Sequence, residues 1–424
     1  MENVVVTGMG MVTSLGATAG ETYRALLGGC SGVRPISGFD TEGFDCRIGA
    51  QASPINPSDL GIHPRDARIM GLQGLMLMKA ARDAFAAGGL DRCPVDANST
   101  GLFMGMGMVD YEFKDLLPAV RASLNRNGTI NDDDFFSRGY REIYPLWPLS
   151  MLNNMALCQV AIHLGIKGEN AVFAPYGDAG AWAVAEGVNA ILENKAAVVL
   201  AGGVSEKISP MSLARGLSAD ILNTEPSPSR NVSPPFRAEG RGTILGEGCG
   251  VMVLESQSSA EKRGAPFLAK VSGFGSAFER EKERNSPTAR AVQGAMEEAM
   301  ADAGIDPARV DLVIAHGDGT DGDKSEIDAI AGFFADAGRP IDAYASKGAL
   351  GNLFAASPVV DTILSICMME KGMVPATLHV DQVEHHTSLN LICRKALQKG
   401  LECVLINTRS HEGQCASLLI TACR

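Results

Sequence analysis

The sequence predicts a layered α/β protein, and three observations indicate this class. Short apolar runs recur along the chain without alternating polar residues, a pattern typical of strands that are buried on both faces. Segments with apolar residues at helical spacing lie between these runs. The chain has 424 residues, a length that favours about two or three hydrophobic cores over one. The apolar runs are residues 4–8, 198–202, 312–316 and 403–407.

Three helices are expected from local signals. Apolar residues at helical spacing over 182–192 predict a helix before the strand near residue 198. A second helix is expected over 286–303, because a Ser-Pro pair opens it as a cap and first turn and Gly304 follows as a stop. A third helix fits residues 324–337 and ends at Gly338.

Two stretches of the chain share one order of elements: a helix, a short polar link, a buried strand and a turn of small residues. The first stretch ends at Gly202 and the second at His316. A pattern repeated in this way indicates a duplicated architecture. Polar and charged residues cluster over 255–265, where we place the join. The sequence therefore predicts two similar α/β halves, residues 1–255 and 256–424.

Charge and hydropathy exclude two classes of partner. The net charge of −12 argues against a nucleic-acid-binding surface, which needs clustered lysine and arginine. No apolar run reaches the roughly 18–20 residues that a membrane helix needs, and the N-terminus has no signal-peptide layout. We therefore expect a cytoplasmic protein that binds neither nucleic acid nor a membrane. The Pro- and Ser-rich segment 224–235 is expected to be a surface loop.

No metal site and no cofactor are expected, because each suggestive motif lacks a required residue. The ten cysteines are scattered without a CxxC pair, so reduced thiols are expected in place of disulfides or metal ligands. The glycine pair that begins at Gly8 lacks the third glycine of a dinucleotide-binding loop. The acidic stretch 318–326 has Asp323 where a calcium loop needs glycine and Ala329 where it needs glutamate. The adjacent histidines at 385–386 are expected on a solvated loop.

Four sequence blocks in a fixed order and spacing resemble the β-ketoacyl synthases, the condensing enzymes of fatty-acid and polyketide assembly. The resemblance extends over essentially the whole chain. It implies a thiolase-like fold, with two similar α/β halves in α-β-α-β-α layers, and a dimer joined through strands near the active sites. The blocks are residues 4–16, 235–237 with 245–254, 315–320 with Asp323 and Glu326 behind them, and 346–352.

The chemistry of that family indicates which residues matter. A cysteine at the head of a buried helix accepts the growing acyl chain as a thioester, because the helix N-terminus favours the thiolate and backbone N–H groups hold the oxyanion. Two histidines then assist the decarboxylation of a malonyl unit on an acyl carrier protein. A lysine and an acidic residue support this arrangement.

The residue that matches the nucleophile is a glycine. Placing residues 183–186 on the family pattern aligns Gly177 with the cysteine. A shift of one residue offers Tyr176 or Asp178, and neither is an adequate substitute. Cys158 is 19 positions away in the sequence. Because glycine has no side chain to acylate, we expect condensing activity to be lost.

The other functional positions are partly retained. The first family histidine is matched by His316 and the lysine by Lys347, whereas Asn352 replaces the second histidine. Asparagine can donate a hydrogen bond but cannot carry the positive charge of an imidazolium, so stabilisation of the enolate weakens. The Gly-Phe-Gly-Gly loop that gates the acyl pocket in the family reads Ser-His-Glu-Gly over 410–413.

Each retained polar residue also has a structural interpretation. His316 would fit a buried hydrogen-bond network. Lys347 would fit an ion pair with an acidic neighbour such as Glu326. Asp178 would cap the helix that opens near Ala179, where its charge suits the helix dipole.

Ketosynthase-like chains without the cysteine are known as chain length factors, the β subunits of type II polyketide synthases. The resemblance implies a heterodimer with a Cys-containing ketosynthase α subunit and a tunnel for a polyketide on an acyl carrier protein. Many such chains carry glutamine at the lost position, so Gly177 indicates a divergent branch, for example one that makes polyenes. By position, residues 105–117 would face the tunnel, with Met108, Tyr111 and Phe113 as its blocking wall; an ordinary core helix is the alternative.

Two other functions stay open. The first is a stand-alone malonyl-carrier-protein decarboxylase, since His316 and Lys347 retain groups that polarise a thioester. Asn352 argues against it. The second is an assembly or scaffold subunit that contributes nothing to the tunnel.

Overall fold

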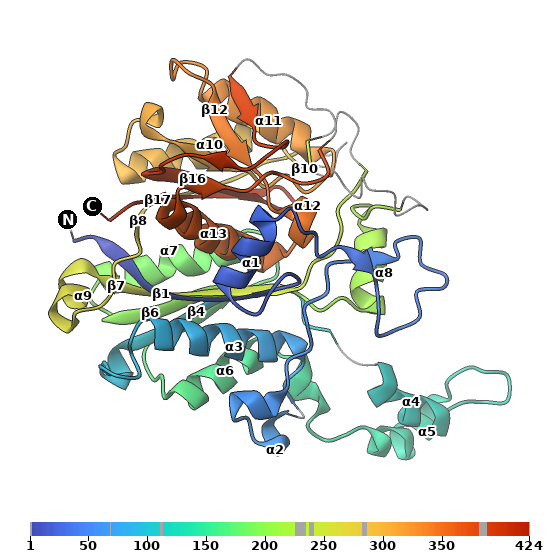
Figure 1. The fold of residues 1–424 in the computed structure, drawn as a ribbon. Helices are drawn as coiled ribbons and strands as arrows, with labels where there is room; N and C mark the ends of the chain where they lie inside the picture. Colours follow the sequence, from blue (N-terminus) through green and yellow to red (C-terminus); the bar gives the residue numbers. More distant parts are fainter. Residues whose placement is uncertain are drawn as a thin grey trace.

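The chain folds into five layers, α-β-α-β-α, as the sequence analysis expects (Figure 1). The computed structural model describes residues 2–67, 69–110, 113–224, 235–236, 241–281, 286–380 and 388–423. Two sheets alternate with three layers of helices. The outer layers hold α3 (Leu72–Ala87) with α6 (Asn153–Leu164), and α10 (Ala289–Ala303) with α11 (Gly322–Phe333); the middle layer holds α7 (Ala179–Leu192) and α13 (Ser357–Lys371).

The main strands form one continuous eleven-stranded sheet that is folded into two β layers, and the layers join at a seam where the first residues of β1 (Val4–Thr13) pair with β8 (Ala269–Phe278). Hydrogen bonding is continuous in the order β14-β12-β11-β16-β17-β8-β1-β7-β6-β4-β5. β1 also pairs antiparallel with β7 along its whole length. The other strands are β4 (Thr100–Met106), β5 (Asn170–Phe173), β6 (Val198–Val204), β7 (Gly248–Ser256), β11 (Leu312–Ile314), β12 (Ile341–Tyr344), β14 (Leu389–Leu391), β16 (Cys403–Arg409) and β17 (Gln414–Thr421).

The four apolar runs predicted as buried strands are confirmed as β1, β6, β11 and β16. Every residue of β6, β11 and β16 is buried, because a helix layer covers each face of these sheets. This double burial explains why the runs do not alternate.

The predicted helices are confirmed with corrected ends. Residues 182–192 lie in α7. The Ser-Pro pair does not open α10, because Ser286 pairs with Glu281 in a short strand and Thr288 caps the helix instead, its side chain accepting from the Ala291 N–H. Gly304 ends α10 with φ of 62°, as expected. The third helix, α11, ends at Phe333, four residues before its predicted end at 337.

Close packing of β1 against α3 explains the first glycine-rich block. Gly8 and Gly10 are strand residues, and a Cβ atom on either would overlap a backbone carbonyl oxygen of α3, that of Ala84 or of Ala80. The block is therefore a packing surface, and the structure rules out a dinucleotide-binding loop here.

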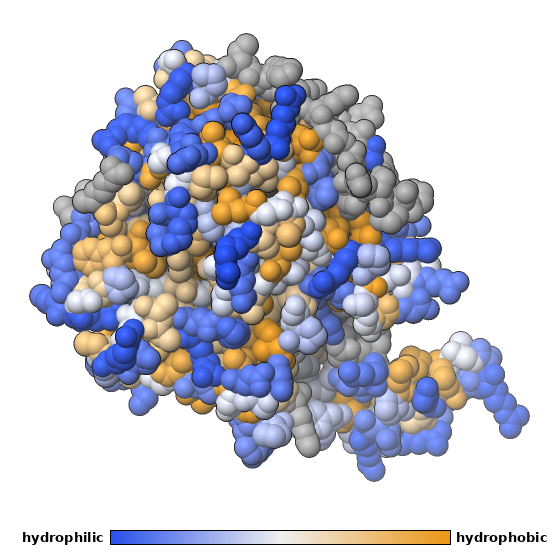
Figure 2. Space-filling model, viewed as in Figure 1, coloured by the Kyte–Doolittle hydropathy of each residue, from blue (hydrophilic) through white to orange (hydrophobic). Residues whose placement is uncertain are grey.

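An arm projects from the layers between β4 and α6, at the lower right of Figure 1. It contains α4 (Phe113–Ala122), α5 (Asp132–Ser137) and a 3-10 turn, η4 (Trp147–Met151). Figure 2 shows apolar side chains on its surface. The exposed large apolar residues of this arm, which ends at residue 152, are Leu117, Leu124, Ile130, Phe136, Tyr140, Tyr144, Leu146, Met151 and Leu152.

Shorter helices complete the described chain. They are α1 (Ala19–Leu27), α2 (Pro64–Ala67), α8 (Pro210–Ser218), α9 (Gln257–Arg263) and α12 (Lys347–Leu350). Within the described ranges, no helix has the length and hydropathy required to cross a bilayer. The expected loop at 224–235 and the histidines at 385–386 lie largely or wholly outside the described residues.

Candidate functional site

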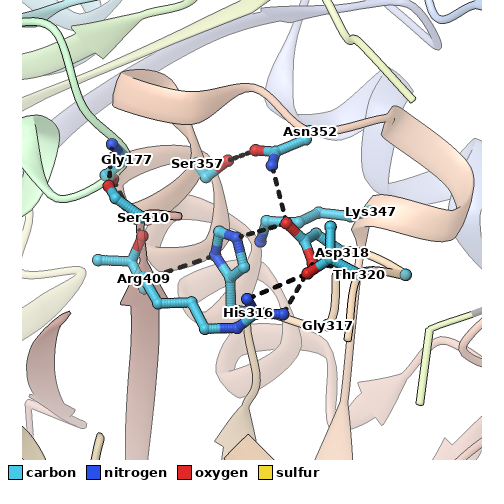
Figure 3. Close-up of polar contacts among 12 residues, drawn as sticks. Gly177, His316, Gly317, Asp318, Thr320, Lys347, Asn352, Ser357, Arg409 and Ser410 are labelled. Carbon is cyan, nitrogen blue, oxygen red and sulfur yellow. Dashed lines mark hydrogen bonds and ion pairs between the residues drawn. The ribbon is translucent and has the colours of Figure 1, made fainter. Parts of the chain in front are cut away.

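Four segments that are distant in the sequence meet at one place in the structure (Figure 3). Gly177 precedes α7, His316 follows β11, and Lys347 opens α12 with Asn352 just beyond its end. The turn after β16 brings Ser410 against Gly177. The structure therefore gathers all four degenerate positions named from the sequence.

Both backbone polar groups of Gly177, its N–H and its carbonyl, are hydrogen-bonded to β16 and the turn that follows it. Its N–H donates to Ser410 Oγ over 2.7 Å, and its carbonyl accepts from Thr408 Oγ1 over 3.0 Å. A Cβ atom at this position would lie 2.8 Å from the Arg409 carbonyl oxygen. The residue at the head of α7 thus offers no nucleophile, and a side chain at this position would require the Arg409 carbonyl group to shift.

Asp178 occupies the N-cap position of α7 but does not cap it with its side chain. Its backbone is in the helical region, with φ of −82°, and its carboxylate makes no capping hydrogen bond. A capping side chain requires an extended backbone, so the predicted cap is wrong. Burial raises the pKa of this carboxyl.

His316 is buried between two partners that engage both ring nitrogens. Nδ1 accepts from the Arg409 N–H over 3.4 Å, and Nε2 lies 3.5 Å from Asp318 Oδ2. Burial, followed by the charge of Lys347, lowers the pKa of the imidazole to about 3. The ring is therefore neutral at physiological pH, and its Nε2 is directed at the Asp318 carboxylate.

Glu326 holds the backbone beside this histidine and not the lysine. Its two oxygens accept from the N–H groups of His316, over 2.6 Å, and of Gly317, over 3.0 Å. Lys347 instead pairs with Asp361 on α13 over 3.2 Å, and both side chains are almost fully buried. The predicted ion pair of Lys347 with an acidic neighbour is confirmed, but the partner is Asp361 and not Glu326, whose oxygens are engaged by backbone N–H groups.

Asn352 is fixed by both ends of its amide. Nδ2 donates to Asp318 Oδ2 over 3.3 Å, while Oδ1 accepts from the Phe354 N–H over 2.9 Å and from Ser357 Oγ over 3.5 Å. The amide therefore links α13 to the loop after β11, a structural role that needs no substrate.

A buried charge cluster around Arg409 was not foreseen from the sequence. Its guanidinium forms ion pairs with Asp318 over 2.7 Å, with Asp323, and with Glu326 over 3.4 Å. It also donates to Thr320 Oγ1 over 3.3 Å. Arg409 is the last residue of β16, whose first four residues are apolar, and a charged residue within such a strand is the one signal that pointed to such a cluster.

The charges of this cluster control its protonation. Burial would raise the pKa of Asp318, but the Arg409 guanidinium and the His316 contact outweigh burial and hold that pKa well below its usual range. Burial, together with the charges of Asp318 and Glu326, raises the pKa of Asp323 to about 7 against the opposing effect of Arg409. The carboxyl groups of the acidic stretch 318–326 thus form ion pairs with the buried Arg409. Among the described residues, no group of His, Cys, Asp or Glu is arranged to hold a metal ion.

One cysteine lies beside the site, although the sequence did not reveal it. Cys415 on β17 pairs directly across the sheet from Arg409 and is buried. Burial strongly raises the pKa of its thiol, so the thiol stays protonated and is a poor nucleophile. All ten cysteines of the chain are free.

A cavity of about 830 Å³ lies where β4 ends, and Met108 lines it. Tyr111 lies outside the described residues, and Phe113 is described only as the first residue of α4, so Met108 is the one predicted wall residue that the structure places at the cavity. Its lining combines apolar residues with polar and charged ones, among them the buried Glu247 and Ser209. Further apolar lining residues are Met70, Met106, Leu152, Met155, Ile208 and Met211.

The five layers and the meeting of these loops define a thiolase-like protein. The N-terminal domain model of β-ketoacyl synthases matches residues 1–260, and the C-terminal domain model matches residues 268–381. The chain therefore belongs to the β-ketoacyl synthase family, a family of acyltransferases.

Individual relatives agree with this assignment. The 3-oxoacyl-(acyl-carrier-protein) synthase 2 of Coxiella burnetii is 27% identical over 420 residues, which cover 99% of this chain and 98% of that protein. The Vibrio cholerae protein of the same name is 28% identical over 421 residues, 98% of each chain. Among solved structures, a β-ketoacyl synthase from Burkholderia phymatum aligns with a TM-score of 0.86 at 25% identity, and the ishigamide ketosynthase/chain length factor with 0.85 at 26%, each covering 100% of both chains.

The neutral state of His316 predicts a loss of stability in acid. Between its ordinary pKa of 6.5 and its folded pKa of about 3, the unfolded chain binds a proton that the folded chain does not. The contribution of His316 to the free energy of unfolding is thus present above pH 6.5 and is lost as the pH falls. Relative to His316→Gln, the wild-type chain should lose about 2 to 3 kcal/mol between pH 7.5 and 4.5 in urea unfolding.

Two controls accompany this measurement. The raised pKa of Asp323 acts in the opposite direction over this range in both chains, so it cancels in the comparison. His163→Gln on the exposed face of α6 should show no such change. An identical pH dependence of wild type and His316→Gln would mean that the imidazole is not buried neutral.

Proposed function

We propose that this chain is a non-condensing ketosynthase subunit, a chain length factor, that pairs with a Cys-containing ketosynthase and shapes the cavity for a growing acyl chain. Gly177 carries the proposal: at the head of α7, where the family places its nucleophile, the chain has no side chain to acylate. A chain that retains the family fold but lacks the nucleophile fits a subunit that forms part of the cavity while its partner carries out the condensation.

Two further features support a partner. The arm over 113–152 exposes many large apolar side chains, and such patches mark contact surfaces. The cavity at Met108 is bordered by the base of the same arm, at Lys114, Asp115 and Leu152. One of the solved structures similar to this chain is described as a ketosynthase with a chain length factor. The acyl chain would arrive on an acyl carrier protein, as the names of the curated relatives indicate for those proteins.

The test is a reconstitution. The chain is co-expressed with a Cys-containing ketosynthase of type II polyketide assembly, and the pair is supplied with malonyl-loaded acyl carrier protein. We expect the two chains to co-purify in equal amounts, and polyketide of defined length to form only when both are present. Product of unchanged length and amount without this chain would refute the proposal.

The engaged state of His316 argues against a stand-alone decarboxylase, because Nε2 faces Asp318 and not an open space. Incubation of the isolated chain with malonyl-loaded carrier protein should therefore release no carbon dioxide above the rate without protein. Release at an enzymatic rate would replace the proposed function by that of a decarboxylase.

A change in the cavity wall should change the product length. Met108→Ala enlarges the cavity and is expected to shift the product distribution toward chains longer by at least one malonyl unit, whereas Met108→Trp should shorten them. Phe113→Ala tests the second proposed wall residue in the same way. Leu192→Ala, at an exposed position on α7, is the control. An unchanged distribution in all cavity variants would favour a scaffold role.

A further inference from the structure

The turn after β16 places the Ser410 hydroxyl group against the backbone of Gly177. The N–H of Gly177 donates to Ser410 Oγ over 2.7 Å. This N–H lies two residues before α7 begins at Ala179, so it has no partner within the helix. In acyl transfer such donors hold the carbonyl oxygen as it becomes negative. We propose that Ser410 is an internal occupant of the oxyanion position, which keeps the site closed to thioesters even when a cysteine is restored at position 177.

The backbone of the turn fixes the position of this hydroxyl group. Ser410 is 5% exposed. Its N–H donates to the Gln414 carbonyl over 2.9 Å, and its own carbonyl accepts from the Gly413 N–H over 3.1 Å. Gly413 has φ of 112°, a conformation that side chains disfavour, so glycine is required to close the turn. Backbone hydrogen bonds therefore hold the turn between β16 and β17 closed, with the Ser410 hydroxyl group directed at Gly177 (Figure 3).

The last residues of β16 also bind the carbonyl group of Gly177. Thr408, two residues before Ser410, donates its hydroxyl hydrogen to the Gly177 carbonyl over 3.0 Å. A Cβ atom at position 177 would lie 2.8 Å from the Arg409 carbonyl oxygen and 3.2 Å from Ser410 Oγ. Glycine at 177 and serine at 410 are therefore adjusted to each other, and restoring the cysteine alone leaves the oxyanion position filled.

The test compares two variants of the isolated chain, Gly177→Cys and Gly177→Cys combined with Ser410→Gly. The probe is hexanoyl-N-acetylcysteamine, a small thioester. In the reaction the introduced thiolate forms a bond to the acyl carbon, the bond from that carbon to the sulfur of N-acetylcysteamine breaks, and the released thiolate takes up a proton. We expect the double variant to be acylated at position 177 at least about tenfold faster than the single variant, as measured by peptide mass spectrometry.

Three controls keep this comparison interpretable. Cys415→Ser in every variant removes the native thiol that pairs across the sheet from Arg409. Thr408→Val added to Gly177→Cys loosens the other side of the peptide and should not accelerate acylation. Circular dichroism reports whether each variant is folded. Equal acylation rates for the folded single and double variants would overturn the proposal.

A second measurement avoids the cysteine. In Ser410→Gly with Gly177 retained, the Gly177 amide loses its acceptor, so its hydrogen exchange should accelerate at least about tenfold relative to wild type. Unchanged exchange would overturn the proposal even if the cysteine variants fail to fold. These experiments use no partner chain, so their failure is distinguishable from a failure of the reconstitution.

Discussion

Replacement of Arg409 by methionine is expected to lower the free energy of unfolding by about 3 to 5 kcal/mol. The guanidinium is 4% exposed and is the cation that faces Asp318, Asp323 and Glu326. Removing it leaves the carboxylates buried without their counter-charge, and desolvated charges without a partner are among the most destabilising defects known. Urea unfolding monitored by circular dichroism measures the loss.

Two variants calibrate this prediction. Arg409→Lys keeps a positive charge but cannot form the same forked contacts, so it should lose less than Arg409→Met. Lys371→Met removes a cation from a surface pair with Glu370, both more than half exposed, and should change the free energy of unfolding by less than about 0.5 kcal/mol. If Arg409→Met costs no more than Lys371→Met, the buried cluster does not hold the site together.

Gly180→Val is expected to destabilise the chain by at least about 3 kcal/mol. Gly180 lies in the first turn of α7, three residues after Gly177, and a Cβ atom there would overlap the Ala355 carbonyl oxygen. Backbone atoms cannot move aside as flexible side chains can, so α7 would be pushed away from α13 and the contact between Gly177 and Ser410 would break. Thermal and urea unfolding measure the loss of stability.

The matched control is a glycine with space around it. Gly332 is a helical residue of α11, and a Cβ atom on it would meet no atom of the surrounding structure within 4 Å. Gly332→Ala should stabilise the chain by about 0.4 to 1 kcal/mol, because alanine reduces the entropy of the unfolded chain. A comparable loss in both variants would show that glycine packing does not position α7.

The layered fold was predictable because strands buried on both faces have a local signature. The run in β6 is apolar at nearly every position, and helices cover both of its sides. The start of α10 was not predictable in the same way. The local sequence at Ser286 and Pro287 is typical of a helix start, but both residues pair with residues 280–281 and form a short strand. Contacts that compete from elsewhere in the fold override local preference.

The positions of the candidate site followed from sequence blocks, but their partners did not. Arg409 lies 91 positions from Asp318 and 83 from Glu326 in the sequence. No local pattern couples residues so far apart, so the buried cluster and the partners of His316 became visible only in three dimensions, although a buried hydrogen-bond network around His316 was expected. Cys415 was missed for the same reason, because its proximity to the site depends on the pairing of β16 with β17.

The seam at β1 has a consequence for any attempt to divide the molecule at the boundary we propose near residues 255–256. Residues 4–6 hydrogen-bond to β7 on one side and to β8 on the other, so β1 connects the two β layers. A protease cut between residues 257 and 268 would nick the polypeptide without releasing either fragment. Deleting the first six residues, by contrast, would remove the strand segment that joins β7 to β8, while leaving every residue of the site unchanged.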